Sequence, residues 1–392
     1  MIDITNKENC TGCHACQGAC PVKCIKMSVD EEGFLYPEVD KDKCIDCGLC
    51  ERVCPVISPQ KTNKSENDIV AYGAYNKNED VRMKSSSGGV FTLIAEEVIA
   101  RGGVVFGACF DDEFKVVHSF AENKEDLERF RGSKYLQSVI GSTYKQAKGF
   151  LDQGRLVYFS GTPCQIGGLY SYLGKSYDNL VTQDIICHGV PSPLIWQKYL
   201  DEVEKKLGGK IREASFRSKA SSWRNYRVII KSENKMTDKS PQQRNVYMLA
   251  FLKNFILRPS CYECHFKDKV RKSDITLADF WGVEKVNPSL DDDKGTSLVL
   301  INSAKGMTIL EKISGKIAYE RVDLDEALRY NPSAIMSVDK NPQREKFIAL
   351  TLKSGFSKSS KLLSKRSLKS RVRSLVKRML IRLGVLKQKG GG

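Results

Sequence analysis

Two cysteine runs near the start of the chain have residue types and spacing that could hold iron–sulfur clusters. The first run is Cys10-x2-Cys13-x2-Cys16-x3-Cys20-Pro21, and the second repeats this spacing with Cys44, Cys47, Cys50, Cys54 and Pro55. Such thiolate runs ligate [4Fe–4S] cubanes, and the cysteine before proline serves the cluster of the other run. We therefore expect one cluster on Cys10, Cys13, Cys16 and Cys54, and a second on Cys44, Cys47, Cys50 and Cys20.

Zinc is the main alternative for this pattern, because Cys-x2-Cys pairs also form zinc sites. A zinc ion takes four tetrahedral ligands and has no use for a third close cysteine followed by Cys-Pro, twice over. The doubled run is typical of a bacterial ferredoxin with two clusters. The sequence therefore predicts that the N-terminal segment transfers electrons one at a time.

The remaining composition favours a cytoplasmic protein. The start of the chain, MIDITNKENC, lacks the basic and apolar regions of a signal peptide. No stretch approaches the roughly 20 unbroken apolar residues of a membrane-spanning helix, and thiolate ligands need a reducing compartment. The net charge is +16, but residues 358–389 hold twelve basic side chains and no acidic one, which leaves about +4 for the rest.

The 392 residues are long enough for two or three domains. We expect an α+β ferredoxin domain at 1–57, a polar linker at 58–68, a mixed α/β domain at 69–350 and a basic amphipathic tail at 351–392. Within the α/β domain, apolar runs predict strands at 103–110, 156–160, 181–187 and 297–302, and periodic segments predict helices at 90–100, 138–151, 193–207 and 304–313. The polar segment 218–245 is expected to be an exposed, irregular excursion with one strand at 226–231.

Six cysteines lie outside the two runs. Cys164 and Cys187 each follow a predicted strand, and the ends of parallel strands meet at the sheet edge where α/β folds place cofactors. Together with Cys261-x2-Cys264 they supply four thiolates, which is enough for a third [4Fe–4S] cluster. Zinc and buried structural cysteine remain alternatives for this set. Cys24 and Cys109 are expected to be structural.

Three loops before predicted helices could hold phosphate. Ser85-Ser86-Ser87-Gly88-Gly89 combines hydroxyls and flexible backbone with the positive end of a helix. The turn at 161–163 and the loop 132–138, with its lysine, are of the same kind. A Ser/Gly cluster is more often only a helix cap, and no G-x-G-x-x-G follows a strand, so the dinucleotide fingerprint is absent.

The part of the chain from about 70 to 335 resembles the coenzyme F420 hydrogenase/dehydrogenase beta-subunit family. The matching stretches occur in the family's order and are SSSGGVFT (85–92), RGSKYLQS (131–138), FSGTPCQIGGL (159–169), DIICHGVPSP (184–193), RPSCYECHF (258–266), DITLADFWG (274–282) and DDKGTSLVLIN (292–302). The resemblance implies a flavin-binding catalytic domain that holds FAD beside a [4Fe–4S] cluster. It assigns phosphate binding to Ser86, Ser87, Gly88 and Gly89, and flavin contacts to Lys134, Gln137, Ser138 and Thr162.

The resemblance fixes the redox machinery better than the substrate. Members of the family act on a deazaflavin (F420-like) or a chlorophyll precursor, and others resemble enzymes of surface-polysaccharide gene sets. We expect an iron–sulfur flavoprotein oxidoreductase that passes electrons between its clusters and an organic substrate through FAD. His188, beside the ligand candidate Cys187, is the candidate proton donor, although such a histidine often only supports the ligand. The alternative function is a non-catalytic relay between a ferredoxin and a partner enzyme.

The basic tail has apolar residues at helical spacing, with Lys and Arg on the other face. These apolar residues are Leu368, Val372, Leu375, Val376, Met379, Leu380 and Leu383. The pattern predicts an amphipathic helix on an anionic membrane surface, which would place the protein peripherally at the inner membrane face. A tail without a fixed structure is the main alternative, and nucleic acid is a weaker one.

Overall fold

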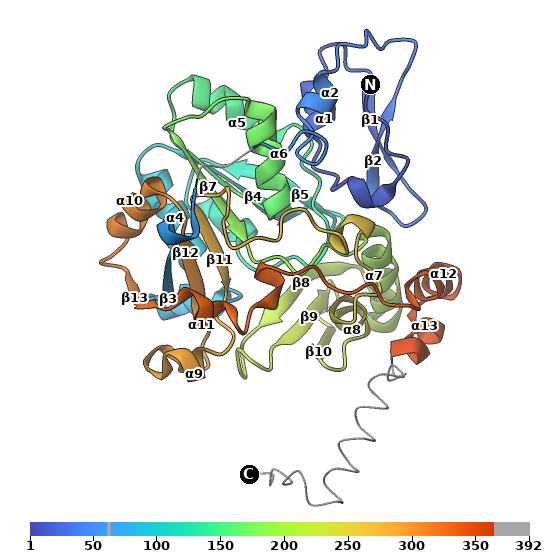
Figure 1. The fold of residues 1–392 in the computed structure, drawn as a ribbon. Helices are drawn as coiled ribbons and strands as arrows, with labels where there is room; N and C mark the ends of the chain where they lie inside the picture. Colours follow the sequence, from blue (N-terminus) through green and yellow to red (C-terminus); the bar gives the residue numbers. More distant parts are fainter. Residues whose placement is uncertain (61–63, 364–392) are drawn as a thin grey trace, which may run out of the picture.

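The computed structural model describes residues 1–60 and 64–363. The N-terminal module (residues 1–57) lies against one end of a larger α/β body (Figure 1). Its hairpin pairs β1 (Ile25–Val29) with β2 (Leu35–Val39) in antiparallel register. The helices α1 (Ala15–Ala19) and α2 (Leu49–Arg52) each begin at a residue with positive φ, His14 and Gly48, so the backbone turns sharply after each pair of cysteines.

A mixed eight-stranded sheet in the order β13-β3-β12-β11-β7-β6-β4-β5 forms the centre of the body. Neighbouring strands β4, β6, β7 and β11 are parallel, and the outer strands pair antiparallel. The fold is therefore mixed α/β, as the sequence predicted. The strands are β3 (Val70–Asn76), β4 (Val104–Phe110), β5 (Val116–Ala121), β6 (Val157–Ser160), β7 (Leu180–Ile185), β11 (Ile275–Asp279), β12 (Ser297–Ile301) and β13 (Ile317–Val322).

Helices cover both faces of this sheet because its central strands are apolar on both sides. Val105 packs with α4 (Val90–Ala100) and α10 (Ala304–Lys312), whereas Val104 and Phe106 pack with α5 (Thr143–Asp152) and α6 (Pro163–Leu173). The helix expected at 138–151 begins only at Thr143, since Gly141 has a positive φ of 56°. The residues before it form a loop that carries several predicted site residues.

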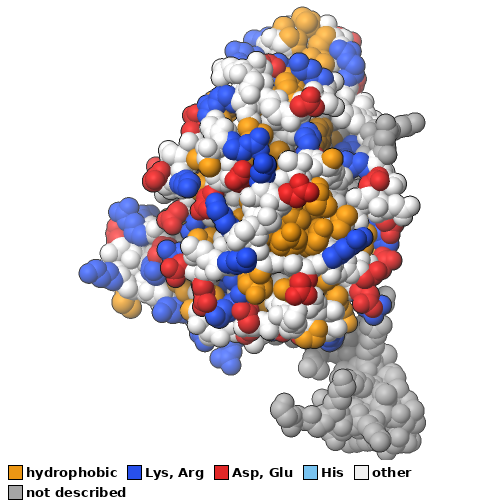
Figure 2. Space-filling view, turned by 90° about the vertical axis from the view of Figure 1, so that its left-hand side faces the viewer, with side chains coloured by type: hydrophobic (Ala, Val, Ile, Leu, Met, Phe, Trp, Pro, Cys, Tyr) orange, Lys and Arg blue, Asp and Glu red, His pale blue; other side chains and the backbone are white. Residues whose placement is uncertain are grey.

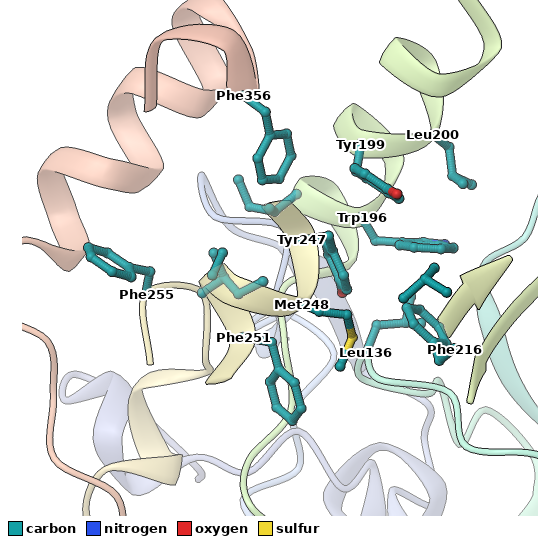
Figure 3. Packing of buried hydrophobic residues seen from close by; sticks show 14 of the residues in the cluster. Leu136, Trp196, Tyr199, Leu200, Phe216, Tyr247, Met248, Phe251, Phe255 and Phe356 are labelled. Carbon is teal, nitrogen blue, oxygen red and sulfur yellow. The ribbon is translucent and has the colours of Figure 1, made fainter. Parts of the chain in front are cut away.

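A second lobe surrounds the aromatic cluster of Figure 3, in which Trp196, Phe216 and Tyr247 pack together. It consists of α7 (Pro193–Leu207), α8 (Val246–Leu252) and a three-stranded sheet of β8 (Ile211–Ser218), β9 (Arg227–Ser232) and β10 (Thr237–Pro241). The strand expected at 226–231 is present as β9. The irregular excursion expected at 218–245 is wrong in its second half, because β9 and β10 form a hairpin there.

The aromatic cluster also holds α12 (Arg344–Ser354) and α13 (Phe356–Leu363), with Phe356 buried. The boundary expected at residue 350 falls inside α12, and the amphipathic helix expected from Leu368 lies outside the described residues. The shorter elements are η1 (Lys7–Asn9), η2 (Glu66–Asp68), α3 (Glu79–Lys84), η3 (Glu125–Phe130), η4 (Pro259–Cys261), α9 (Val283–Val286), η5 (Pro288–Leu290), α11 (Leu324–Leu328) and η6 (Pro332–Ala334).

The turn between β1 and β2 fastens the module to the body. Glu32 receives two hydrogen bonds from the guanidinium of Arg344, and its backbone oxygen accepts one from the hydroxyl of Ser192. Gly33 has a positive φ of 88°, and a Cβ added there would lie 2.3 Å from the Cβ of Leu194. The module is therefore seated on α12 through Glu32 and on α7 through Gly33, where only glycine permits the close approach.

Figure 2 shows one face of the molecule, on which basic and acidic side chains are intermixed around a hydrophobic patch. The excess of positive charge in the sequence is thus not gathered into one basic surface on this face. Among residues 1–60 and 64–363, no helix is both long and apolar enough to cross a membrane.

Candidate iron–sulfur site

The module gathers its cysteines into two hollows, each lined by one of the two predicted ligand sets. Residues of both runs line each hollow, because α1 carries the chain from one hollow to the other. The proximal set, Cys10, Cys13, Cys16 and Cys54, lines the first hollow. The distal set, Cys20, Cys44, Cys47 and Cys50, lines the second, together with Cys24.

The thiols surround these hollows and do not converge on a single point. Within the described part of the chain, no three His, Cys, Asp or Glu side chains are grouped closely enough to hold one metal ion. A zinc ion needs sulfur ligands about 2.3 Å away on all sides, whereas a cubane keeps its ligands apart around a larger core. Each hollow is lined by the four thiols of one predicted set, which is the ligand count of a cubane.

Cys24, which the sequence analysis treated as structural, is buried beside the distal set. Its Sγ lies 3.4 Å from the Sγ of Cys20, and its backbone N–H donates to that sulfur. Such an N–H is the kind of group that orients a cluster ligand and tunes its potential. Cys109 is buried in the core on β4.

A third hollow lies in the body and brings together Cys164, Cys187, Cys261 and Cys264. Cys164 is in the first turn of α6, which a capping box between Thr162 and Gln165 begins, and Cys187 follows β7. Since β6 and β7 are parallel neighbours, both cysteines lie at one edge of the sheet. These four cysteines, the body set, line about 460 Å³ of empty space that is partly open to solvent.

Positive side chains surround the body set. Arg258, Lys267 and Arg271 line its hollow. Burial raises the pKa of the Cys187 thiol, and Lys267 and Arg271 act in the opposite direction. Burial likewise raises the pKa of Cys261 to about 12, against a smaller effect of Arg258. Thiols in this environment favour the protonated form, so binding of a cluster at this set would release their protons.

The proximal and body hollows are neighbours. Thr11 lines both of them. On the body side, a Cβ added to Gly168 of α6 would lie 2.9 Å from the Cβ of Cys13, so this glycine lets the module approach closely. Every residue that lines the distal hollow belongs to the module, and Cys47 is exposed. The three thiol sets therefore run from the surface of the module through its docked side into the body.

The Ser85–Gly89 loop is held tightly by residues from the strands around it. The hydroxyl of Ser86 accepts hydrogen bonds from the backbone N–H and the hydroxyl of Ser133, which joins two of the three predicted phosphate loops. Ser87 donates to the carbonyl of Thr296. A Cβ added to Gly88 would lie 2.4 Å from the carbonyl oxygen of Ala74. Gly89, with φ 79°, begins α4.

Two buried cations reinforce this loop. Lys219 donates to the carbonyls of Arg82, Ser87 and Lys294 at 2.6 to 2.7 Å, and burial lowers its pKa to about 7. Arg217 forms two hydrogen bonds with Asp279 and one with the carbonyl of Ser86. The loop is therefore a rigid element at the sheet edge.

The four residues expected to contact flavin fall into three places. Lys134 donates to the carbonyls of Arg129 and Arg131, and burial lowers its pKa to about 7. It follows Ser133 and so lies near Ser86. Gln137 instead faces the module, because its amide nitrogen donates to the carbonyl of Thr11 at 3.0 Å and its oxygen accepts from Arg258 at 2.9 Å. Both of its polar ends are thus in use.

Ser138 and Thr162 belong to a separate polar network centred on His118. The Nε2 of His118 lies 3.0 Å from the carbonyl of Ser160, which can only accept, so Nε2 carries the proton and Nδ1 accepts from Ser138. Gln165 donates to Ser138, and the Thr162 hydroxyl lies 3.1 Å from the Sγ of Cys164. Burial lowers the pKa of His118 to about 4.

His188 lines the body hollow, beside the ligand candidates. Its Nε2 lies 2.8 Å from the amide oxygen of Asn254, which only accepts, so this nitrogen is protonated and Nδ1 is left with the lone pair. Burial lowers the pKa of His188. The edge of the ring meets Phe251, which stacks on Tyr135. His188 is therefore held in one orientation by the second lobe.

Sequence reasoning missed His118 and Arg258. Nothing around His118 in the sequence marks it, because the partners of its ring come from two other segments, at Ser138 and at Phe159–Ser160. Arg258 stands three residues before Cys261, in the stretch RPSC. Its position close to the ligand candidate Cys261 is a signal that could have identified Arg258.

Family models account for most of this architecture. The coenzyme F420 hydrogenase/dehydrogenase beta subunit matches through its N-terminal model at residues 71–143 and its C-terminal model at 154–327. A 4Fe-4S dicluster domain matches residues 9–57. No curated protein matches the chain.

Among solved structures, a chain of the F420-reducing [NiFe] hydrogenase complex from Methanosarcina barkeri is similar. It has 17% sequence identity and a TM-score of 0.47, and the match covers 68% of this chain and 88% of that one. The chain is thus of iron–sulfur oxidoreductase type: it belongs to the coenzyme F420 hydrogenase/dehydrogenase beta-subunit family and carries a 4Fe-4S dicluster domain at its N-terminus.

Proposed function

We propose that the protein is an FAD-dependent oxidoreductase in which three [4Fe–4S] clusters, on the distal, proximal and body sets, connect an electron partner with an organic substrate. The observation that carries this proposal is the body hollow, where four thiols from the start of α6, the segment after β7 and the 258–264 segment meet beside Thr11 of the module. An electron carrier made of the module alone would need no thiols there.

The chemistry of the donors suits the groups that they would hold. Each set offers four thiols around a hollow, which is the ligand count of a cubane. The hydroxyls near Ser86 and the amine of Lys134 suit a phosphate-bearing cofactor, whereas the amide of Gln137 already bonds Thr11 and Arg258. Bound FAD would supply the exchange between two-electron and one-electron chemistry.

His188 is the residue that we assign to proton handling. Its unprotonated Nδ1 would accept or return a proton at the substrate, and the hydrogen bond to Asn254 would hold the ring for this role. The lowered pKa keeps the imidazole neutral near pH 7. The Asn254→Ala variant should free the ring and lower turnover with little change in iron content.

The substrate is proposed only by class. A deazaflavin or an intermediate of surface-polysaccharide biosynthesis would each suit a domain of this family. The electron partner would be a ferredoxin or the subunit of a partner enzyme, and it would meet the module where Cys47 is exposed. We assign the residues beyond Leu363 a membrane-surface role on sequence grounds alone. Co-sedimentation with anionic vesicles, with and without residues 364–392, tests that role, and the deletion leaves α13 intact.

Iron analysis of Cys264→Ser tests the body cluster, with Cys109→Ser as the matched control. Cys264 lines the body hollow, whereas Cys109 is a buried cysteine of β4 that lines none of the three thiol-lined hollows. We expect Cys264→Ser to lose about four irons and Cys109→Ser to lose none. Equal iron in both variants would contradict the body cluster.

The alternative function is an electron relay with no catalysis of its own. The two functions differ in bound flavin, which a relay does not need. Heating the purified protein releases non-covalent flavin, which chromatography then identifies. The proposed enzyme yields FAD, and a relay yields none.

A further inference from the structure

Arg258 occupies the junction between the proximal and body sets. Its side chain is fully buried. The Nε donates to the carbonyl of Cys10 at 2.8 Å, and one terminal nitrogen lies 3.6 Å from the Sγ of Cys10. The same side chain lines the body hollow, and its backbone carbonyl accepts from the N–H of Cys261. One residue thus touches ligands of both sets.

The remaining contacts of Arg258 hold it rigidly. The guanidinium donates to the carbonyl of Leu35 at 2.9 Å and to the amide oxygen of Gln137 at 2.9 Å. It lies 4.2 Å from the centre of the Tyr36 ring. A Cβ added to Gly12 would lie 3.0 Å from its Nη1, so the module leaves room for this one side chain.

No carboxylate pairs with Arg258 among the residues that the structure describes. Its hydrogen-bond acceptors are carbonyl and amide oxygens and the Sγ of Cys10, and none of them is a carboxylate. A buried charge without a counter-ion is strongly unfavourable. The other buried arginine of the docking surface, Arg344, does have a carboxylate partner in Glu32. The counter-charge of Arg258 must come from something that binds at the junction.

We propose that Arg258 is a positioning residue whose counter-ions are the iron–sulfur clusters on either side, and that its charge raises the reduction potential of the proximal cluster. Four thiolates outweigh the charge of a cubane core, so each cluster is anionic and becomes more so on reduction. A fixed cation beside Cys10 therefore favours the reduced state. The part of this inference that concerns the body cluster rests on the function proposed above.

The test is a redox titration of the full-length holoprotein followed by EPR, in wild type, Arg258→Gln and Arg258→Lys. In Arg258→Gln we expect the proximal cluster to become harder to reduce, with about a tenfold lower ratio of reduced to oxidised cluster, equivalent to about 59 mV for one electron. Arg258→Lys keeps the charge and should restore most of the potential. Arg258 contacts Cys10 of the proximal set, and the residues lining the distal hollow all belong to the module. The distal cluster therefore serves as the internal reference and should not move.

The double variant Glu32→Gln/Arg344→Gln separates charge from docking. It removes the other buried arginine contact of the module without changing the net charge, so the proximal potential should stay at the wild-type value. A folded Arg258→Gln protein with full iron and an unshifted proximal cluster would overturn the inference, as would an equal shift in the double variant. Absence of the body cluster would show as missing iron in the wild type, and it would leave the proximal result unaffected.

Discussion

The contact between Glu32 and Arg344 should determine how firmly the ferredoxin module stays docked. The side chain of Arg344 is 3% exposed and that of Glu32 is 16% exposed, so the pair is largely removed from water. Breaking a buried pair by removing one partner costs about 3–5 kcal/mol. In Glu32→Gln, Arg344 keeps its hydrogen bond to the carbonyl of Leu257 at 2.8 Å. We therefore expect a loss below this range, of about 2 kcal/mol.

Hydrogen exchange at the β1–β2 turn measures this loss. The backbone N–H of Phe34 donates to the carboxylate of Asp30, and the Phe34 side chain is fully buried. A loss of about 2 kcal/mol corresponds to roughly 30-fold faster exchange of this amide if exchange requires undocking.

Glu31→Gln is the matched control, because Glu31 stands in the same turn but is 77% exposed in its pair with Lys7. Surface pairs of this kind contribute about 0–1 kcal/mol, so exchange at Phe34 should change far less than in Glu32→Gln. Equal effects in the two variants would refute the reasoning that burial of the Arg344 pair holds the module.

Three further outcomes are expected. Cys54→Ser should abolish the EPR signal of the proximal cluster and leave that of the distal cluster, whereas Cys50→Ser should do the reverse; loss of the same cluster in both would contradict the crossed ligand sets. Gly168→Ala should displace the module, since the added Cβ would lie 2.9 Å from both the Cβ of Cys13 and the hydroxyl of Tyr144. Faster proteolysis of the intact chain after residue 57 would measure this displacement. Burial lowers the pKa of His118 from 6.5 to about 4, so the unfolded chain takes up a proton before the folded one does as the pH falls. The free energy of unfolding should therefore fall by about 3 kcal/mol between pH 6.5 and 4. Urea unfolding should show a weaker pH dependence in His118→Gln.

The cysteine sets could be predicted from the sequence because their geometry is local or follows from one rule. The spacing of the doubled run determines which thiols can surround one cubane. For Cys164 and Cys187, it was enough that two parallel strands end at the same edge of a sheet. The structure places both beside Cys261 and Cys264.

What sequence reasoning missed depends on contacts between distant segments. The sequence did not reveal that the amide of Gln137, which a motif assigns to flavin, donates to the carbonyl of Thr11 in the module. The start of α5 was set too early, because Gly141 adopts a positive φ that no periodicity reveals. The strand β10 was overlooked because its sequence, TDKSP, is polar throughout and has no apolar alternation. Arg258 has no signal except its place beside a cysteine.

The content of iron, sulfide and flavin in the anaerobically purified protein tests the central claim most directly. Three cubanes beside a flavin predict about twelve irons, about twelve sulfides and one FAD per chain, with visible absorbance from both chromophores. About eight irons and no flavin would contradict the account. In that case the body set would hold no cluster, and the chain would be an electron relay.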